Sequence, residues 1–264
     1  MKRETLIREL GLGPVWRLRE RAVDAAPPPE PPLAAEATET GVPPRLTFEE
    51  TARADAGDRQ AAIARMDWDE LKSAVAGCRA CGLCQARKQA VLGVGDQEAD
   101  WLFIGEGPGA EEDERGEPFV GQAGKLLDAM LAAIDLKRGP GQGDGEGGGV
   151  YIANAVKCRP PNNRTPEAEE TAACWPYLER QIALIRPKLI VALGRPAAQT
   201  LLQREVKIAS ARGRVFDFAG VPLIVTYHPA YLLRNLPDKA KAWEDLVFAR
   251  SMASTVASAD PPVA

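Results

Sequence analysis

The cysteines are the residues whose spacing points most directly to chemistry. Five are present, in the pattern Cys78-x2-Cys81-x2-Cys84 followed by Cys158-x15-Cys174. A C-x2-C pair presents two thiolates from one turn, and a distant second pair can complete a four-thiolate site for zinc or for an iron–sulfur cluster. The sequence has a single histidine, which excludes a site with two cysteine and two histidine ligands. The spacing therefore predicts a metal site, but it neither chooses the metal nor says which early cysteine is the spare.

Three polar residues stand where predicted strands end. Glu106 follows the apolar run 101–105, Asn154 lies late in the run 151–157, and His228 closes the segment VPLIVTYH. In open parallel sheets, ligands bind beyond the carboxyl ends of the strands. We therefore expect these three side chains to converge on one rim and form a site there.

The elements that must position these residues alternate between short apolar runs and helical patterns. Strands are predicted at 101–105, 151–157 and 188–194, and an antiparallel pair is predicted from GRVFDF and VPLIVTYH. Helices are predicted at 123–136, at 165–187 with Thr165 as N-cap, at 196–203 and at 239–254. This order predicts an α/β fold: a three-layer αβα sandwich with a mostly parallel four-stranded central sheet.

The segment GEGPGAEEDERGEPFVGQAGKLLD (105–128) is rich in glycine directly after a strand, which lets the backbone approach a ligand closely. It lacks the Lys-Ser/Thr of a phosphate-binding P-loop and the spacing of a dinucleotide fingerprint. Its acidic run, residues 111–114, would repel a phosphate backbone unless it is directed at chemistry. Glu111 and Glu114 are interpreted as parts of a solvated loop.

The composition of the chain indicates its cellular location and its division into an extension, a folded domain and a tail. The 264 residues contain no run of about 18 apolar residues and begin without a signal-peptide core, so we expect a cytoplasmic protein without a membrane span. Net charge is −4, yet residues 151–234 carry 12 Lys and Arg against 6 Asp and Glu. Residues 1–65 are expected to be a largely disordered Ala- and Pro-rich extension, residues 66–257 the folded domain, and residues 258–264 a disordered tail. For residues 1–22 two interpretations stay open: a docking peptide for a protein partner, or an extension without one.

Four ordered motifs resemble one known family, the family 4 uracil-DNA glycosylases, which are the iron–sulfur branch of their superfamily. The motifs are GEGPGAEEDERGEPFVGQAG, YIANAVKCRPPNNRTP, the Cys158-x15-Cys174 spacing and YHPAYLLRN (227–235), between about Cys78 and Trp243. The resemblance implies a monomeric enzyme that removes uracil from single- or double-stranded DNA in base excision repair, leaving an abasic site. The extension before residue 66 and the Gly-rich insertion at 139–149 depart from the family core.

The resemblance also implies a 4Fe-4S cluster with a structural role. The family's first cysteine pair is followed by x-Leu, which matches Cys78, Cys81 and Leu83 in this chain. The implied ligands are Cys78, Cys81, Cys158 and Cys174, with Cys84 as the spare.

An enzyme that acts on a base must first extrude it from the duplex. By resemblance, Phe119 is the ring on which uracil stacks, Asn154 reads its edge, and neutral His228 stabilises the departing anion near O2. The water-activating carboxylate is expected to be Glu106, with Glu112 as the second candidate, and Gly107 is expected in the uracil pocket.

The segment AYLLRN (230–235) resembles the loop that enters the DNA minor groove. Leu232 or Leu233 would fill the gap left by the extruded base, and Arg234 would hold a backbone phosphate. Lys157, Arg159 and Arg164 in the segment 157–166 are expected to follow the phosphates.

Two alternatives remain beside the glycosylase interpretation. A non-catalytic iron–sulfur DNA-binding protein would keep the cysteines but lose Asn154 or His228, and both are present. A covalent uracil-DNA cross-linking relative carries a basic, histidine-containing insertion after the first motif, whereas ERGEPFVG follows it here.

Overall fold

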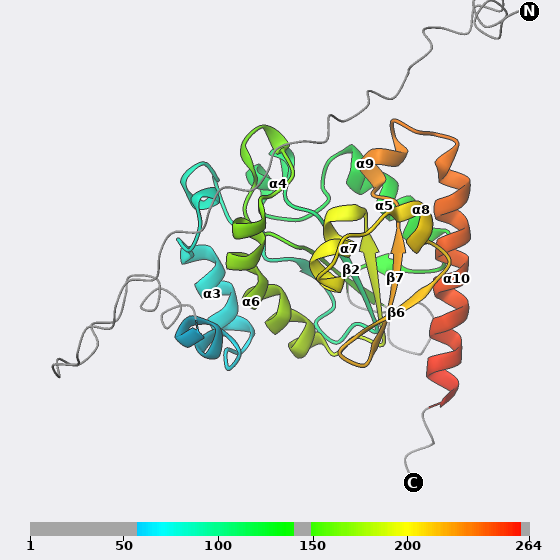
Figure 1. Ribbon diagram of the computed structural model, residues 1–264, viewed down its shortest axis with the longest axis horizontal. Coiled ribbons are helices and arrows are strands. Elements are labelled where there is room, and N and C mark those ends of the chain that lie inside the picture. The colour runs from blue at the N-terminus through cyan, green and yellow to red at the C-terminus, as the bar shows by residue number, and fades with distance from the viewer. Residues whose placement is uncertain (1–56, 140–148, 260–264) are drawn as a thin grey trace, which may run out of the picture. The chain divides into compact units, whose positions relative to one another are not determined.

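A computed structural model of the chain describes residues 57–139 and 149–259, with side chains described as far as residue 253. The described residues form one seven-stranded sheet in the order β1-β4-β2-β5-β7-β6, with β3 paired to β4 (Figure 1). The strands are β1 (Val94–Gly95), β2 (Trp101–Gly105), β3 (Lys137–Arg138), β4 (Gly149–Asn154), β5 (Leu189–Leu193), β6 (Val215–Phe218) and β7 (Val221–Thr226).

The predicted α/β class is confirmed, and the sheet is larger than the four strands expected. Its centre is four parallel strands, β4-β2-β5-β7, and β6 pairs antiparallel with β7 as predicted. The additional strands β1 and β3 are two residues long and pair with β4, the outermost of the four parallel strands. Every residue of β2, β4 and β5 is buried, as expected for parallel strands covered on both faces.

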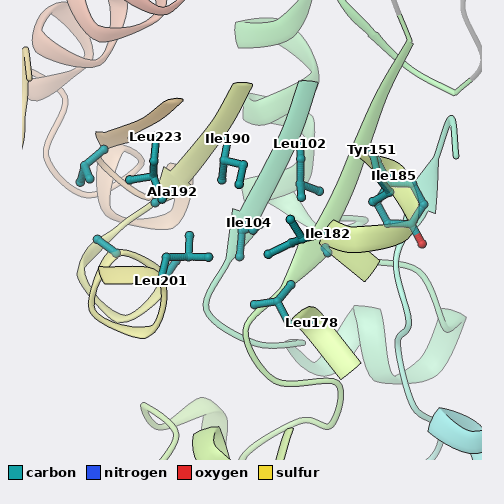
Figure 2. Close-up of a cluster of buried hydrophobic side chains, with 14 of the residues drawn as sticks. Leu102, Ile104, Tyr151, Leu178, Ile182, Ile185, Ile190, Ala192, Leu201 and Leu223 are labelled. Atoms are coloured by element: carbon teal, nitrogen blue, oxygen red, sulfur yellow. The ribbon is translucent and has the colours of Figure 1, made fainter. Parts of the chain in front are cut away.

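One face of the sheet packs against α6 (Ala168–Ile185) and α7 (Arg195–Leu202). Alternate residues of the central strands point to this face and meet apolar side chains of both helices, as Figure 2 shows. The labelled members of this cluster are Leu102, Ile104, Tyr151, Ile190, Ala192 and Leu223 from the sheet, and Leu178, Ile182, Ile185 and Leu201 from the helices.

The intervening strand residues point to the other face, where they form a second cluster with α5 (Gln122–Ala132) and α10 (Asp238–Ala259). The fold is therefore the predicted three-layer αβα sandwich. Full burial of each large aliphatic side chain contributes about 1.5–3 kcal/mol. The two clusters hold the strand ends in fixed positions, and those ends carry the candidate site.

A third apolar cluster lies beside α6, where α3 (Trp68–Gly77) runs along it (Figure 1). It includes Cys158, Cys174 and Ile63, and residues 57–63 are helical. Ile63 packs into this cluster, so packed helical residues lie before residue 66, where the folded domain was expected to begin. The remainder of the extension, residues 1–56, and most of the Gly-rich insertion lie outside the described residues.

The remaining elements are short: η1 (Gly82–Gln85), α4 (Ala110–Arg115), η2 (Pro161–Asn163), α8 (Ile208–Ala211) and α9 (Pro229–Leu232). The start of α6 differs from the expected N-cap at Thr165. The helix begins at Ala168, because the Glu170 carboxylate accepts a hydrogen bond from the Glu167 backbone N–H at 2.8 Å and closes the first turn there. None of the described helices is long and apolar enough to cross a membrane.

Candidate active site

A cleft of about 680 Å³ opens at the carboxyl ends of the parallel strands. It brings together residues from five separate segments of the chain, as the strand-end argument predicted. Seven of the expected site residues line it: Glu106, Gly107, Glu112, Phe119, Asn154, His228 and Arg234. Leu232 and Leu233 are not among the lining residues.

Asn154 ends β4 with an amide oxygen that has no partner. The residue is 2% exposed, and Oδ1 accepts no hydrogen bond from any described residue. A buried acceptor left unpaired costs about 1–3 kcal/mol, so this atom is suited to a ligand that brings an N–H. Gly105 makes the space for it, since a Cβ at that position would lie 2.5 Å from Oδ1 and 2.6 Å from the Phe119 ring.

Phe119 lies on the loop between α4 and α5, with its ring beside that of His228. The ring centroids are 5.4 Å apart and the planes are inclined by 29°. Phe119 has a φ of 55°, a left-handed backbone that few non-glycine residues adopt. Arg138 stabilises this conformation, because its guanidinium donates to the carbonyl oxygens of Pro118 and Phe119 at 2.6 and 2.9 Å.

His228 is the N-cap of α9, and this contact decides its tautomer. Nδ1 accepts a hydrogen bond from the Ala230 backbone N–H at 3.1 Å, so the proton of the neutral ring lies on Nε2. Burial, and after it the positive charge of Arg234, lower the pKa of His228 to about 4. The ring is therefore neutral near pH 7 and offers Nε2–H as a donor.

The two candidate carboxylates differ in what already holds them. Glu112 accepts from the backbone N–H of Gly109 through Oε2 and from Val120 and Gly121 through Oε1, at 2.9–3.1 Å. It therefore ties the glycine-rich turn to the loop that carries Phe119. No described residue donates a hydrogen bond to the carboxylate of Glu106 at the cleft wall, so this geometry favours Glu106 as the partner of a water molecule.

Leu232, the last residue of α9, and Leu233, which follows it, differ in their exposure. Leu232 is 1% exposed and packs inside the protein, whereas Leu233 is 40% exposed. Of the two candidates for the wedge, only Leu233 is available at the surface. Arg234 is exposed beside it, and the Tyr231 hydroxyl donates to Asp238 at 2.6 Å, which closes the loop onto α10.

The basic segment after β4 differs from the expected row of phosphate contacts. Lys157 is 1% exposed, and its ammonium donates to the Asn154 carbonyl oxygen at 2.9 Å, so the prediction that it follows the phosphates is wrong. Arg164 lines the cleft but donates to both carboxylate oxygens of Glu170. Arg159 donates to Asn163 at 2.7 Å.

All five cysteines line a second, small pocket between η1, α3 and α6. The sulfurs of three of them already accept hydrogen bonds: Cys158 from Arg87 at 2.8 Å, Cys174 from the Lys157 backbone N–H at 3.2 Å, and Cys78 from Arg59 at 3.9 Å. Burial raises the pKa of the Cys174 thiol to about 12, so a thiolate there requires positive charge nearby. Within the described ranges, no three His, Cys, Asp or Glu side chains are arranged to hold a metal ion. The pocket supplies the thiol donors and the surrounding cations that a thiolate-bound cofactor needs.

Some cleft residues were not singled out from the sequence. Gly194 and Arg195 follow β5, and Tyr227 precedes His228. The end of the predicted strand 188–194 could have indicated Gly194 and Arg195, since the same argument led to Glu106 and Asn154. Nothing in the local sequence indicated Arg138, whose role depends on the pairing of β3 with β4.

Comparison with known proteins agrees with this geometry. The family model of the uracil DNA glycosylase superfamily matches residues 92–247, which include the lining residues of the cleft. The chain is 41% identical over 189 residues to a type-4 uracil-DNA glycosylase of Pyrobaculum aerophilum, covering 69% of this chain and 92% of the relative. It is 44% identical over 178 residues to that of Thermotoga maritima, covering 66% of this chain and 88% of the relative.

A type-5 uracil-DNA glycosylase of Pyrobaculum aerophilum is more distant, at 36% identity over 149 residues, or 53% of this chain. The type-4 relatives match a longer part of the chain at higher identity. The chain therefore belongs to the uracil DNA glycosylase superfamily, as its ordered motifs and its strand-end cleft predicted.

Proposed function

We propose that this chain is a uracil-DNA glycosylase of the type-4 group, which hydrolyses the bond between uracil and deoxyribose in DNA and leaves an abasic site. The observation that carries the proposal is the unpaired oxygen of Asn154 at the base of the cleft. Uracil offers N3–H to that acceptor and O4 to the amide N–H₂. Cytosine has an acceptor at N3 and a donor at C4, so both contacts would be lost, at about 1–3 kcal/mol each.

The proposed chemistry is a displacement at C1′ of an extruded nucleotide. Water forms a bond to C1′ while the C1′–N1 bond breaks and its electron pair moves into the uracil ring. Glu106 orients the water and accepts the proton that it loses, which finally passes to the released uracil anion. Nε2–H of neutral His228 donates to O2 as negative charge develops there. Because that charge is absent from the bound substrate, the His228 contact lowers the barrier more than it strengthens binding.

In the proposed cofactor site, Cys78, Cys81, Cys158 and Cys174 hold a 4Fe-4S cluster that stabilises the fold around the cleft. The support is the convergence of the cysteines on one pocket, the basic groups beside them and the family motif. The cluster supplies no step of the hydrolysis, which the cleft residues account for. Leu233 and Arg234 are proposed to contact the DNA, the first in the gap left by the base and the second at a phosphate.

The proposal is tested by incubating the purified protein with single- and double-stranded oligonucleotides that contain one deoxyuridine, followed by alkaline cleavage of abasic sites. Strand breaks at the deoxyuridine, and none in matched oligonucleotides with thymidine or deoxycytidine, are expected. Protein that carries the visible iron–sulfur absorption and binds the DNA but produces no breaks would instead support a non-catalytic DNA-binding role.

A further inference from the structure

Lys157 lies between the cysteine pocket and the uracil-reading residue and contacts both. Its backbone N–H donates to Cys174 Sγ at 3.2 Å, and the next residue in the chain is Cys158. Its side chain turns back along the chain and donates from Nζ to the Asn154 carbonyl oxygen at 2.9 Å. With 1% of its surface exposed, this lysine is out of reach of DNA.

A buried ammonium is costly unless negative groups compensate it. Lys157 itself lines the cysteine pocket, where the thiolates that hold the proposed cluster would supply that negative charge. The other partner is the main-chain carbonyl of Asn154, a neutral acceptor. The charge of the cysteine site therefore helps to keep the ammonium in place, and the ammonium in turn fixes the end of β4.

The position of the Asn154 side chain depends on how its backbone is held. Its side-chain oxygen has no hydrogen-bond partner among the described residues. No hydrogen bond to that oxygen therefore fixes the position of the side chain. The turn that follows is held by backbone bonds from Ala155 to Gly105 and from Val156 to Glu106, and by the Lys157 ammonium. A shift of the Asn154 backbone would move the amide away from the uracil edge.

We propose that Lys157 is a positioning residue through which the cysteine site and uracil recognition are energetically coupled. The proposal rests on the proposed function, since it assumes a cluster in the pocket and uracil at Asn154. Coupling between two sites is reciprocal. If the thiolate side helps to position Asn154, uracil bound at Asn154 must in turn stabilise the cysteine site.

The test uses the loaded enzyme and follows loss of its visible iron–sulfur absorption in an oxidant and an iron chelator. The probes are duplexes containing a non-hydrolysable 2′-fluorinated deoxyuridine analogue, or thymidine at the same position. In the unmodified enzyme the uracil duplex should slow the loss about fivefold relative to the thymidine duplex, at the lower end of typical coupling between sites.

Two variants assign the effect to Lys157. Lys157→Met keeps the length of the side chain but cannot donate to Asn154, and the difference between the two duplexes should disappear. Arg87→Met is the matched control: Arg87 donates to Cys158 Sγ and to the carbonyl oxygens of Ala76 and Cys78, but not to Asn154. This variant should lose the cluster faster and still show the fivefold difference.

Two results would overturn the proposal: an equal rate of loss with both duplexes in the unmodified enzyme, or an unchanged difference in Lys157→Met. If Lys157→Met does not fold, an equal rate of loss with both duplexes in the unmodified enzyme still refutes the coupling. Uracil excision is measured on the same preparation, so that an enzyme that cleaves normally but shows no duplex dependence refutes the coupling and leaves the glycosylase function standing.

Discussion

The two polar groups proposed to recognise uracil are positioned by contacts close to them in sequence. His228 is oriented by the backbone N–H of Ala230, two residues away, and Asn154 by the ammonium of Lys157, three residues away. The first contact is made by Nδ1 of His228 and the second by the backbone carbonyl of Asn154. Each contact fixes its residue without using the atom proposed to meet uracil, which is Nε2 of His228 or Oδ1 of Asn154. Such preorganisation lets the donor and acceptor act without reorganisation when charge develops on the base.

The lowered pKa of His228 gives a prediction for the pH dependence of excision. Because the folded-state pKa is about 4, the ring stays neutral through the range where an ordinary histidine is protonated. Single-turnover rates should show no decline centred near pH 6.5 that depends on His228. An acidic decline with a midpoint near 6.5 that disappears in His228→Gln would contradict the assignment.

The same pKa affects stability, with the opposite sign to that of a salt-bridged histidine. The unfolded chain binds a proton at His228 from about pH 6.5 downward, whereas the folded protein binds it only near pH 4. The free energy of unfolding should therefore fall as the pH is lowered through this window. Urea unfolding of the wild type and of His228→Gln between pH 4.5 and 7.5 measures the contribution.

The cysteines give a second prediction at the residue scale. Cys174→Ser should abolish the visible absorption, because it removes a buried ligand next to Lys157. Cys84→Ser should retain the absorption and the iron content, since the proposed ligand set does not include Cys84. Iron analysis with visible spectroscopy checks both variants. Loss of iron in Cys84→Ser with retention in Cys81→Ser would reassign the first ligand pair.

At the scale of elements, the loop between α4 and α5 is held from two sides. Glu112 of α4 ties three backbone N–H groups, and Arg138 of β3 ties two carbonyl oxygens while pairing with Asp128 of α5. Gly124 completes the fit, since a Cβ there would lie 1.7 Å from the Phe119 oxygen. The position of the Phe119 ring, the expected stacking surface for uracil, therefore depends on residues from three elements.

Arg138→Ala should weaken excision by loosening this loop. Each of the two hydrogen bonds from the charged guanidinium contributes about 1.5–3 kcal/mol. Losing them should therefore lower the single-turnover rate tenfold or more. Lys188→Ala is the control, because its ion pair with Asp100 is exposed at the opposite ends of the strands. Equal rates in both variants would remove Arg138 from the positioning of Phe119.

The loop after α9 predicts opposite effects for two adjacent leucines. Leu233→Ala should leave the free energy of unfolding nearly unchanged but slow excision from duplex DNA more than from single strands, because no gap needs filling in a single strand. Leu232→Ala should lower the free energy of unfolding by about 2–5 kcal/mol, as for other buried leucines. Urea unfolding and excision from both substrates separate the two roles, and a duplex-specific defect in Leu232→Ala alone would reverse the assignment.

At the scale of the whole molecule, the sequence predicted the layers and the convergence of strand ends, because long apolar strands and capped helices carry local patterns. It did not predict β1 and β3, since two-residue strands have no periodicity and form only by pairing with β4. The packing of Ile63 could not be predicted, because one large aliphatic residue among alanines and charged residues carries no signal until it is buried in the third cluster.

The burial of Lys157 could not be predicted from the sequence for a related reason. In the segment KCRPPNNRTP a lysine has the character of a solvated cation, and only the packing of α6 and the cysteine pocket against β4 buries it. The residues that the family motifs proposed for uracil and DNA were placed on the cleft except the two leucines. The motifs therefore indicated where these side chains meet, whereas the burial of Lys157 depends on tertiary packing.

The most direct test of the account is excision by Asn154→Asp at saturating enzyme. The carboxylate still accepts from uracil N3–H but faces O4 without a donor, so the single-turnover rate should fall about five- to 150-fold, for 1–3 kcal/mol of lost recognition. Asn163→Asp is the matched control on the cleft wall, since its side chain accepts from Arg159 and needs no donor. A wild-type rate in Asn154→Asp, with its visible absorption intact, would contradict the proposal that Asn154 reads uracil.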